Sequence, residues 1–354
     1  MPENTSRTTY REHTDTENIL KLRQVLSTLP AFCKDYFRAI DSTTTTKTRI
    51  SYAYDIRIFF QFLLDENPTF KKYAMTDFSV DVLDQIKAVD LEEYMEYLKV
   101  YQNGDKTETN GERGLKRKIS ALRSFYAYYY KREMIHTNPT VLIDVPKIHD
   151  KSIIRLDADE VALLLDYIEH CGDSLTGQKR VYYEKTKERD LAIVTLLLGT
   201  GIRVSECVGL DIEDVDFKNN GIKVTRKGGN EMVVYFGEEV EKALKRYLEI
   251  REGITPLAGH EHALFYSAQR KRMGVQAVEN MVKKYSRQIT TTKKITPHKL
   301  RSTYGTALYQ ETGDIYLVAD VLGHKDVNTT KKHYAALDDA RRRLAATAVR
   351  LRED

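Results

Sequence analysis

The feature that most constrains the fold is a change in hydrophobic pattern across a proline-containing segment near the middle of the chain. Before this segment, apolar residues recur at helical spacing; after it, helical patterns flank one group of short strand patterns. Pro139 and Pro146 disfavour helix in the residues that precede them. We therefore predict a helical domain over residues 17–140 and a mixed domain over residues 156–354, joined by a linker at residues 141–155.

Amphipathic helices define the first predicted domain. The stretches 46–64 and 111–131 each carry an apolar stripe at helical spacing. The second stretch ends in the tyrosine run 126–130, which we interpret as core rather than as a base-stacking surface, because such tyrosines usually pack inward. Residues 1–16 are polar and unpatterned, so we expect a mobile tail there.

The second predicted domain mixes helices with a small sheet. Residues 190–198 are apolar nearly all round, which indicates a helix buried in the core. Three short runs, 215–217, 222–225 and 232–236, predict an antiparallel three-stranded meander. The predicted fold class is therefore α+β and mainly helical. The apolar run 191–198 is far shorter than the ~20 residues that span a bilayer, so we expect no membrane partner.

Cysteine usage and the N-terminal sequence bear on the compartment. Cys33, Cys171 and Cys207 are scattered, and they form neither a disulfide framework nor a metal-binding pair. No basic and then apolar leader opens the chain. We therefore expect a cytoplasmic protein with no metal site.

Positive charge is clustered in this chain. Residues 1–150 hold 22 basic and 22 acidic side chains, whereas residues 261–310 hold 10 and 2, a local charge of +8 (10 − 2). A basic helix face in the first domain can lie along DNA, although a solvated face would give the same pattern. Two such clusters favour a polyanionic partner, because phosphates are neutralised by clustered cations. The candidate DNA-binding residues are Arg113, Lys116, Arg117 and Arg123.

One motif in the second domain has the residue types of a phosphate site. Thr296 and Pro297 predict the start of a helix, and its first turn places His298 and Arg301 on one face. An imidazole beside a guanidinium at a helix N-terminus can bind phosphate. The pattern is weak by itself, because a surface His and Arg at this spacing occur often by chance.

Two further motifs supply isolated cations. The buried helix ends at Gly199 and Gly201 and leads into Arg203, which needs an anionic partner. Glu206 lies one turn later, and it either forms a structural ion pair or orients Arg203 toward a phosphate. Lys227 lies at the tip of the predicted hairpin, where a solubilising lysine is also common.

The order of these residues along the chain is more specific than any one of the motifs alone. The succession of Arg, Lys, His-x-x-Arg, Gly-His and Tyr resembles the tyrosine recombinases, the phage integrase family with its Xer-like members. The segments TGIRVSECVGL, ITPHKLRSTYGTAL and VLGHKDVNTTKKHY look like the three signature boxes of that family. The resemblance covers about residues 155–345, and KRKISALRSFYAYYYKREMIHTNP looks like the end of the family's helical, SAM-like core-binding domain.

The resemblance implies how a DNA phosphate would be held. Arg203 and Arg301 would bind its non-bridging oxygens, with a bidentate geometry that lysine cannot reproduce. His298 and His324 would hydrogen-bond the phosphate, and His298 is the candidate acceptor of the nucleophile's proton. Fixed positive charge of this kind stabilises the transition state without a metal, so no cofactor is expected.

The resemblance also implies the nucleophile and the general acid. Tyr334 would attack the phosphate and form a 3′-phosphotyrosine, and Lys227 would protonate the leaving 5′-oxygen. Arg226 stands before this lysine where the family usually has glycine, and Lys223 on the preceding strand is a competing candidate. Residues 335–354 would form the segment that docks into a neighbouring subunit.

The implied activity is that of a site-specific DNA recombinase. Its partners would be double-stranded DNA with inverted-repeat core sites and other copies of the chain, monomeric or dimeric when free and tetrameric on two sites. An accessory protein is a further candidate partner. Chromosome dimer resolution and mobile-element integration or excision both remain open as the role. The alternatives are a type IB topoisomerase-like enzyme and a catalytically silent DNA-binding regulator.

Overall fold

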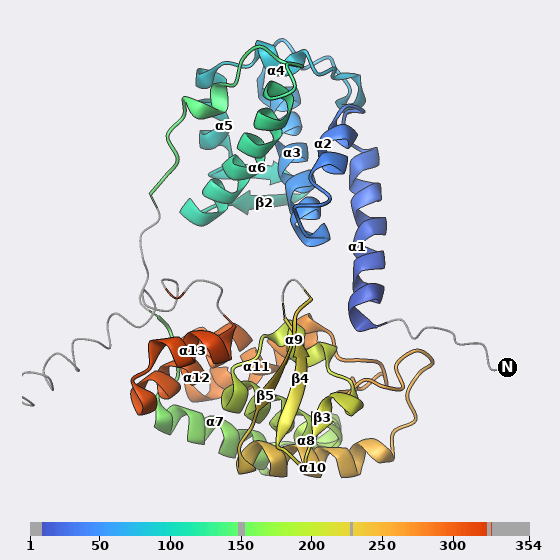
Figure 1. The fold of residues 1–354 in the computed structure, drawn as a ribbon, viewed down its shortest axis with the longest axis vertical. Helices are drawn as coiled ribbons and strands as arrows, with labels where there is room; N and C mark the ends of the chain where they lie inside the picture. The colour runs from blue at the N-terminus through green and yellow to red at the C-terminus, as the bar shows by residue number, and fades with distance from the viewer. Residues whose placement is uncertain (1–8, 148–152, 227–228, 324–326, 328–354) are drawn as a thin grey trace, which may run out of the picture. The chain divides into compact units, whose positions relative to one another are not determined.

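The chain divides into two compact units, residues 1–150 and 151–354 (Figure 1). This division comes from a computed structural model that describes residues 9–147, 153–226, 229–323 and 327. The boundary between the units falls within the predicted linker, residues 141–155. The functional assignment of each domain remains a prediction.

The first unit is mainly helical, as predicted. Short 3-10 turns lie at Met75–Asp77 and Pro139–Val141. Its helices and strands are α1 (Tyr10–Ser27), α2 (Cys33–Ala39), α3 (Thr46–Glu66), α4 (Val82–Gln85), α5 (Ala88–Tyr97), β1 (Val100–Asn103), β2 (Lys106–Thr109) and α6 (Glu112–Tyr130).

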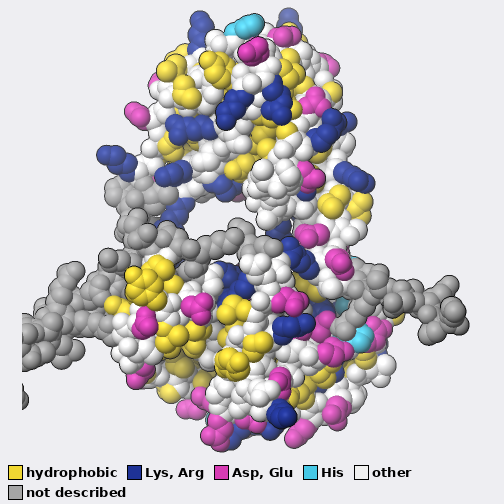
Figure 2. All heavy atoms as spheres, viewed as in Figure 1, with side chains coloured by type: hydrophobic (Ala, Val, Ile, Leu, Met, Phe, Trp, Pro, Cys, Tyr) yellow, Lys and Arg dark blue, Asp and Glu magenta, His cyan; other side chains and the backbone are white. Residues whose placement is uncertain are grey.

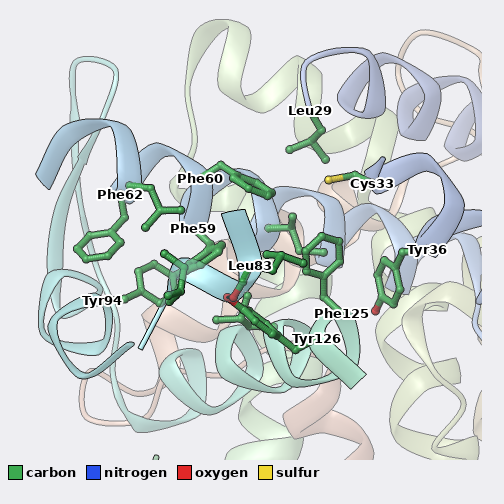
Figure 3. Close-up of a cluster of buried hydrophobic side chains, with 14 of the residues drawn as sticks. Leu29, Cys33, Tyr36, Phe59, Phe60, Phe62, Leu83, Tyr94, Phe125 and Tyr126 are labelled. Atoms are coloured by element: carbon green, nitrogen blue, oxygen red, sulfur yellow. The ribbon is translucent and has the colours of Figure 1, made fainter. Parts of the chain in front are cut away.

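The core of this unit is built from aromatic side chains of α2, α3, α5 and α6 (Figure 3). Phe59 and Phe60 on α3 are completely buried. Rings meet edge to face, with centroids 5.3 Å apart for Phe59 and Tyr94 and 5.2 Å apart for Tyr36 and Phe125. Each such ring contributes about 1.5–3 kcal/mol through burial, and the edge contacts add specificity to the packing.

The predicted interpretation of the tyrosine run 126–130 as core is confirmed for two of its members. Tyr126 and Tyr129 are fully buried on α6. The hydroxyl of Tyr129 donates to the carbonyl of Phe32 at 2.7 Å, so its polar atom is satisfied inside the unit. These two rings are therefore structural, and only Tyr130 at the end of the helix is exposed.

Two local expectations for the first unit were wrong. Residues 10–16, part of the predicted tail 1–16, form the start of α1. Thr9 caps this helix, and its N–H donates to Oε2 of Glu12 at 2.7 Å in a capping box. The helical expectation for residues 17–140 also missed the β1–β2 hairpin, in which Asn103 pairs with Lys106 across a tight turn.

The second unit combines helices with a small sheet. Short 3-10 turns lie at Cys171–Ser174 and Ile212–Asp214. Its helices are α7 (Ala158–His170), α8 (Gly177–Thr200), α9 (Val204–Gly209), α10 (Glu238–Glu252), α11 (Val275–Ile289), α12 (Pro297–Thr312) and α13 (Ile315–Leu322). Its strands are β3 (Val215–Asp216), β4 (Gly221–Thr225) and β5 (Glu231–Tyr235).

The predicted meander is confirmed as an antiparallel sheet in the order β3-β4-β5. Ile222 pairs with Val215 on one side and with Val234 on the other. Ile222 and Val224 are buried while Lys223 and Thr225 are exposed, as expected for a strand with one face on the core.

Helix α8 is the central element of this unit, with α7, α10 and α12 packed around it. The predicted buried helix at residues 190–198 is confirmed as the C-terminal part of α8, where almost every side chain is inaccessible to solvent. The helix begins at Gly177, earlier than predicted. Its first part, residues 177–189, is mostly polar and therefore lacks the apolar pattern that marked residues 190–198. Within the described part of the chain, no helix combines the length and the apolarity needed to cross a bilayer.

Candidate active site

The end of α8 is set by two glycines with different roles. Gly199 lies close to α10, and a Cβ placed on it would meet Cγ2 of Val240 at 2.5 Å. Gly201 ends the helix with φ of +62°, in the left-handed region that glycine adopts without strain. The chain therefore turns sharply after α8, and the next basic residue is the half-buried Arg203.

Arg203 is held by Glu206 in the first turn of α9. Its backbone N–H donates to Oε2 of Glu206 at 2.8 Å, and its Nη1 donates to Oε1 of the same carboxylate at 2.8 Å. The Glu206 side chain is 3% exposed, whereas that of Arg203 is 34% exposed. Glu206 thus forms the ion pair with Arg203 that was one of the two predicted alternatives, and it also fixes the direction in which the guanidinium points.

Helix α12 begins at Pro297, as predicted, with Thr296 as its N-cap residue. His298 in the first turn is exposed, but Arg301 is only 4% exposed. Nη1 of Arg301 donates to the carbonyl of Gly201 at 2.5 Å, and Nη2 donates to the carbonyl of Leu322. Arg301 therefore ties the end of α8 to the end of α13.

The C-terminal end of α13 brings together three arginines that are far apart in sequence. The last carbonyls of a helix lack partners within it and form the negative end of the helix dipole. Here the carbonyl of Leu322 accepts from Arg301, and that of Gly323 accepts from Nη2 of Arg203 at 3.3 Å. The third arginine, Arg226, donates to the carbonyls of Val321 at 2.7 Å and Leu322 at 3.1 Å.

Arg226 is a site residue whose role sequence reasoning missed. Its side chain is 8% exposed, and burial lowers the pKa of its guanidinium, with Glu206 acting in the opposite direction. The signal was present in the strand alternation, because the inward row of Ile222 and Val224 continues to Arg226.

Lys223, the competing lysine, lies on the other face of β4. It is exposed, and its Nζ lies 3.8 Å from Oδ1 of Asp214 and 3.8 Å from Oε1 of Glu231. This face is opposite to the one from which Arg226 reaches Glu206. Lys223 therefore belongs to a surface ion-pair cluster rather than to the group of arginines.

Three predicted site residues lie outside the described residues: Lys227, His324 and Tyr334. The predicted exchange segment, residues 335–354, lies outside them as well. Among the described tyrosines near the motifs, Tyr304 packs against Gly201, and burial raises the pKa of its hydroxyl. Tyr316 is 71% exposed on α13.

The four candidate DNA-binding residues on α6 differ in their surroundings. Arg113 and Lys116 are exposed. Arg117 forms an ion pair with buried Asp55, to which its Nη2 donates at 2.8 Å. Arg123 donates from Nε to the carbonyl of Thr140 at 3.1 Å and from Nη2 to that of Ile143 at 2.7 Å.

Charge is unevenly distributed over the second unit. Figure 2 shows acidic side chains gathered where α10 lies, and the first turn of this helix contains Glu238, Glu239 and Glu241. The arginines described above lie instead around the end of α13. Among the residues that the structure describes, no group of three or more His, Cys, Asp and Glu side chains is placed to hold a metal ion.

Comparison with known proteins matches residues 155–341 to the phage integrase family. Tyrosine recombinase XerC of Caldanaerobacter subterraneus subsp. tengcongensis is 32% identical over 322 residues, which cover 88% of this chain and 83% of that protein. Tyrosine recombinase XerS of Streptococcus uberis is 30% identical over 345 residues, which cover 90% of this chain and 95% of that protein.

Solved structures show the same fold. A XerH site-specific recombinase bound to palindromic difH substrate, in a post-cleavage complex, matches with a TM-score of 0.63 at 20% identity, covering 97% of this chain and 90% of that one. The Tn1549 transposon integrase in complex with circular intermediate DNA matches with a TM-score of 0.62 at 21% identity, covering 88% and 98%. The family match and the long alignments with two recombinases together establish that the chain belongs to the phage integrase family and is a tyrosine site-specific recombinase.

Proposed function

We propose that this recombinase cuts and rejoins double-stranded DNA at inverted-repeat sites through a covalent 3′-phosphotyrosine on Tyr334. The observation that carries the proposal is the Arg203–Glu206 pair beside the buried Arg301, at the point where three separate sequence motifs meet. The solved relatives that share the fold are described as complexes with DNA. Ordered cations of this kind suit a phosphodiester substrate.

In the proposed reaction, the hydroxyl oxygen of Tyr334 attacks the scissile phosphorus while the bond from phosphorus to the 5′-oxygen breaks. His298 accepts the phenolic proton, and Lys227 donates a proton to the leaving oxygen. The phosphotyrosine keeps the energy of the broken bond, so a 5′-hydroxyl of another strand can reverse the step without ATP. Strands are thereby exchanged rather than merely cut.

Charge neutralisation at the phosphate is assigned to the arginines. Arg203 is suited to it because its guanidinium is partly exposed yet fixed by Glu206. Arg301 acts from a buried position at the junction of α8, α12 and α13. His324, which directly follows Gly323 in the sequence, supplies a further hydrogen bond to the phosphate.

We assign the general acid to Lys227 rather than to Lys223. Lys223 is near two carboxylates and on the face of β4 away from Arg226 and Glu206. Lys223 is therefore engaged with other side chains and lies away from the arginines that would hold the phosphate. Both support placing the acid in the hairpin turn.

Contact with the duplex away from the reaction is assigned first to Arg113 and Lys116 of α6, which are exposed. Arg117 and Arg123 also hold parts of their own unit, through Asp55 and through the carbonyls of residues 140 and 143. Their share in DNA binding is therefore expected to be smaller.

Assembly and biological role follow from the same proposal. A strand exchange between two sites needs four subunits, so we propose a tetramer on two sites, with residues 335–354 reaching a neighbouring subunit. The likeness to XerC and XerS over most of the chain favours chromosome dimer resolution, and mobile-element integration or excision is the alternative role. Action in the cytoplasm and help from an accessory protein remain predictions.

The test compares Arg203→Ala with Arg203→Lys on a DNA whose nick lets the short 5′-hydroxyl product diffuse away. Cleavage by Arg203→Ala should fall by about 100-fold to 1000-fold, while binding to the site changes little. Arg203→Lys should recover only part of the rate, because it keeps the charge but loses the fork. Arg246→Ala, which removes a surface arginine paired with Glu169 and Glu188, is the control. Loss of DNA affinity by Arg203→Ala instead of loss of cleavage would show that Arg203 serves binding alone.

A further inference from the structure

Arg226 occupies a position that the proposed reaction does not explain. It follows β4 directly and lies on the inward row of that strand, with its side chain 8% exposed. A buried guanidinium is costly unless its donors are satisfied. The guanidinium of Arg226 donates to Glu206, to the carbonyls of Val321 and Leu322, and to the sulfur of Met232, all of which lie within the site or the hairpin.

The carboxylate of Glu206 is shared between two arginines. Oε1 accepts from Nη1 of Arg203 at 2.8 Å, and Oε2 accepts from Nη1 of Arg226 at 3.4 Å and from the backbone N–H of Arg203 at 2.8 Å. A carboxylate that accepts hydrogen bonds on both oxygens cannot rotate without breaking at least one of them. The direction of the Arg203 guanidinium is therefore set partly by Arg226.

The same guanidinium fits closely against the end of α13. A Cβ placed on Gly323 would lie 3.0 Å from Cζ of Arg226, and Gly323 has φ of +61°. Gly323 also supplies the carbonyl that accepts from Arg203. Arg226 thus touches both groups that hold Arg203, which are Glu206 on α9 and the last turn of α13.

We propose that Arg226 is a positioning residue that holds the Glu206 carboxylate against the C-terminal end of α13 and thereby orients Arg203 toward the scissile phosphate. The proposal rests on the proposed function, in which Arg203 neutralises charge on that phosphate. It adds an arginine that never touches the DNA but on which the geometry of the phosphate-binding arginine depends.

The test exploits the charge that Arg203 is meant to neutralise. A methylphosphonate at the scissile position carries a methyl group in place of one charged oxygen. A misplaced arginine should therefore slow cleavage of the methylphosphonate less than it slows cleavage of the phosphate. Cleavage of nicked DNA by wild type, Arg203→Ala, Arg226→Met and Arg226→Lys is measured on both the phosphate and the methylphosphonate. On the phosphate, Arg226→Met should be slowed by about 10-fold to 100-fold. On the methylphosphonate, most of that loss should disappear.

A double-mutant cycle supplies a readout that a merely structural role would not move. If Arg226 acts through Arg203, then Arg226→Met should cost little more once Arg203 is already alanine. Arg226→Lys keeps a cation but not the fork, so it should be intermediate. Additive losses in the double variant would overturn the proposal, whatever the effect of each single substitution.

Arg251→Met is the matched control for burial and stability. Arg251 is 9% exposed, and its guanidinium donates to the carbonyls of Glu261, Ala263 and Leu264, none of which is among the described hydrogen-bond partners of Arg203, Arg226 or Glu206. Per folded molecule, measured by circular dichroism, this variant should cleave the phosphate and the methylphosphonate in the wild-type ratio. If it shifted that ratio as Arg226→Met does, loss of any buried arginine would suffice and the positioning role would fail.

Two further outcomes separate the proposal from its premise. If Arg203→Ala itself gained nothing on the methylphosphonate, the assignment of Arg203 to the phosphate would be wrong, and the double-mutant cycle would still decide whether Arg226 acts through it. A third substrate carries sulfur in place of the bridging 5′-oxygen. Its leaving group is a thiolate, which departs without needing a proton. If this substrate, and not the methylphosphonate, rescued Arg226→Met, the residue would act on the leaving group through its own hairpin, which contradicts the proposal.

Discussion

Replacing Gly201 by alanine tests how tightly the end of α8 is packed against the site. The glycine has φ of +62°, a backbone conformation that costs an alanine about 1–2 kcal/mol. The added Cβ would also lie 2.3 Å from Cδ1 of Tyr304 and 2.9 Å from Cδ2 of Leu322. Forcing such overlaps to relax costs roughly a further 1–3 kcal/mol.

The expected loss for Gly201→Ala is therefore about 2–5 kcal/mol of the free energy of unfolding. In a unit of about 200 residues, each kcal/mol lowers the melting temperature by roughly 2–4 °C. Thermal unfolding of the full chain, followed by far-UV circular dichroism, measures the shift in the transition of the second unit.

Gly177→Ala is the matched control at the other end of the same helix. Gly177 has φ of +57°, but nothing lies within 4 Å of the position its Cβ would take. It should lose only the conformational part, about 1–2 kcal/mol. Combining Gly201→Ala with Tyr304→Ala should remove most of the steric part and give a favourable coupling energy. Equal losses for Gly201→Ala and Gly177→Ala would refute the close packing of Tyr304 on Gly201.

Two other predictions concern DNA binding and acid stability. Reversing charge at Arg113 and Lys116 together should weaken DNA binding and lower the slope of log K against log salt by nearly one per lost contact; Lys242→Glu on α10 should leave the slope unchanged. An unaltered slope in the double variant would remove α6 from the interface. Asp84 accepts hydrogen bonds from the backbone of His136 and Thr137, which outweigh its partial burial and lower the pKa of its carboxyl. Its stabilising contribution should be present above the ordinary carboxyl pKa and lost as the pH falls through the lowered one. Urea midpoints measured against pH should therefore fall less steeply in acid for Asp84→Asn than for wild type, and parallel curves would contradict the assignment.

The parts of the fold that follow from local pattern could be predicted from the sequence. Helices α3 and α6 of the first unit and the start of α12 at Pro297 have apolar spacing or capping residues that specify them without distant contacts. The meander was predictable because turn residues separate three short apolar runs.

The misses in the first unit had local signals that were weaker than their surroundings. The turn between β1 and β2 contains Asn103 and Gly104, with φ of +63° at the glycine, which is a hairpin signal inside a mostly helical region. Helix α1 begins in a polar stretch, and only the pairing of Thr9 with Glu12 marks its start.

The geometry of the site could be predicted only in part. The order of motifs identified Arg203 and Glu206 as candidates. It could not show that the Glu206 carboxylate would accept hydrogen bonds from two arginines. Arg226 looked like a departure from a glycine position, because its partners Val321 and Leu322 lie about a hundred residues away in the sequence. The burial of Arg301 could not be predicted either, because its spacing from His298 fixes a helical face but not the depth of burial.

Covalent trapping of DNA by Tyr334→Phe and by wild type tests the central claim most directly. The substitution removes one oxygen and keeps the ring, so folding and binding of the site should be retained. Wild type, incubated with nicked DNA in EDTA, should give a protein–DNA adduct on a denaturing gel, and Tyr316→Phe, which alters an exposed tyrosine on α13, should do the same. Tyr334→Phe should give none. An adduct with Tyr334→Phe, or a wild-type reaction that required magnesium, would contradict the account.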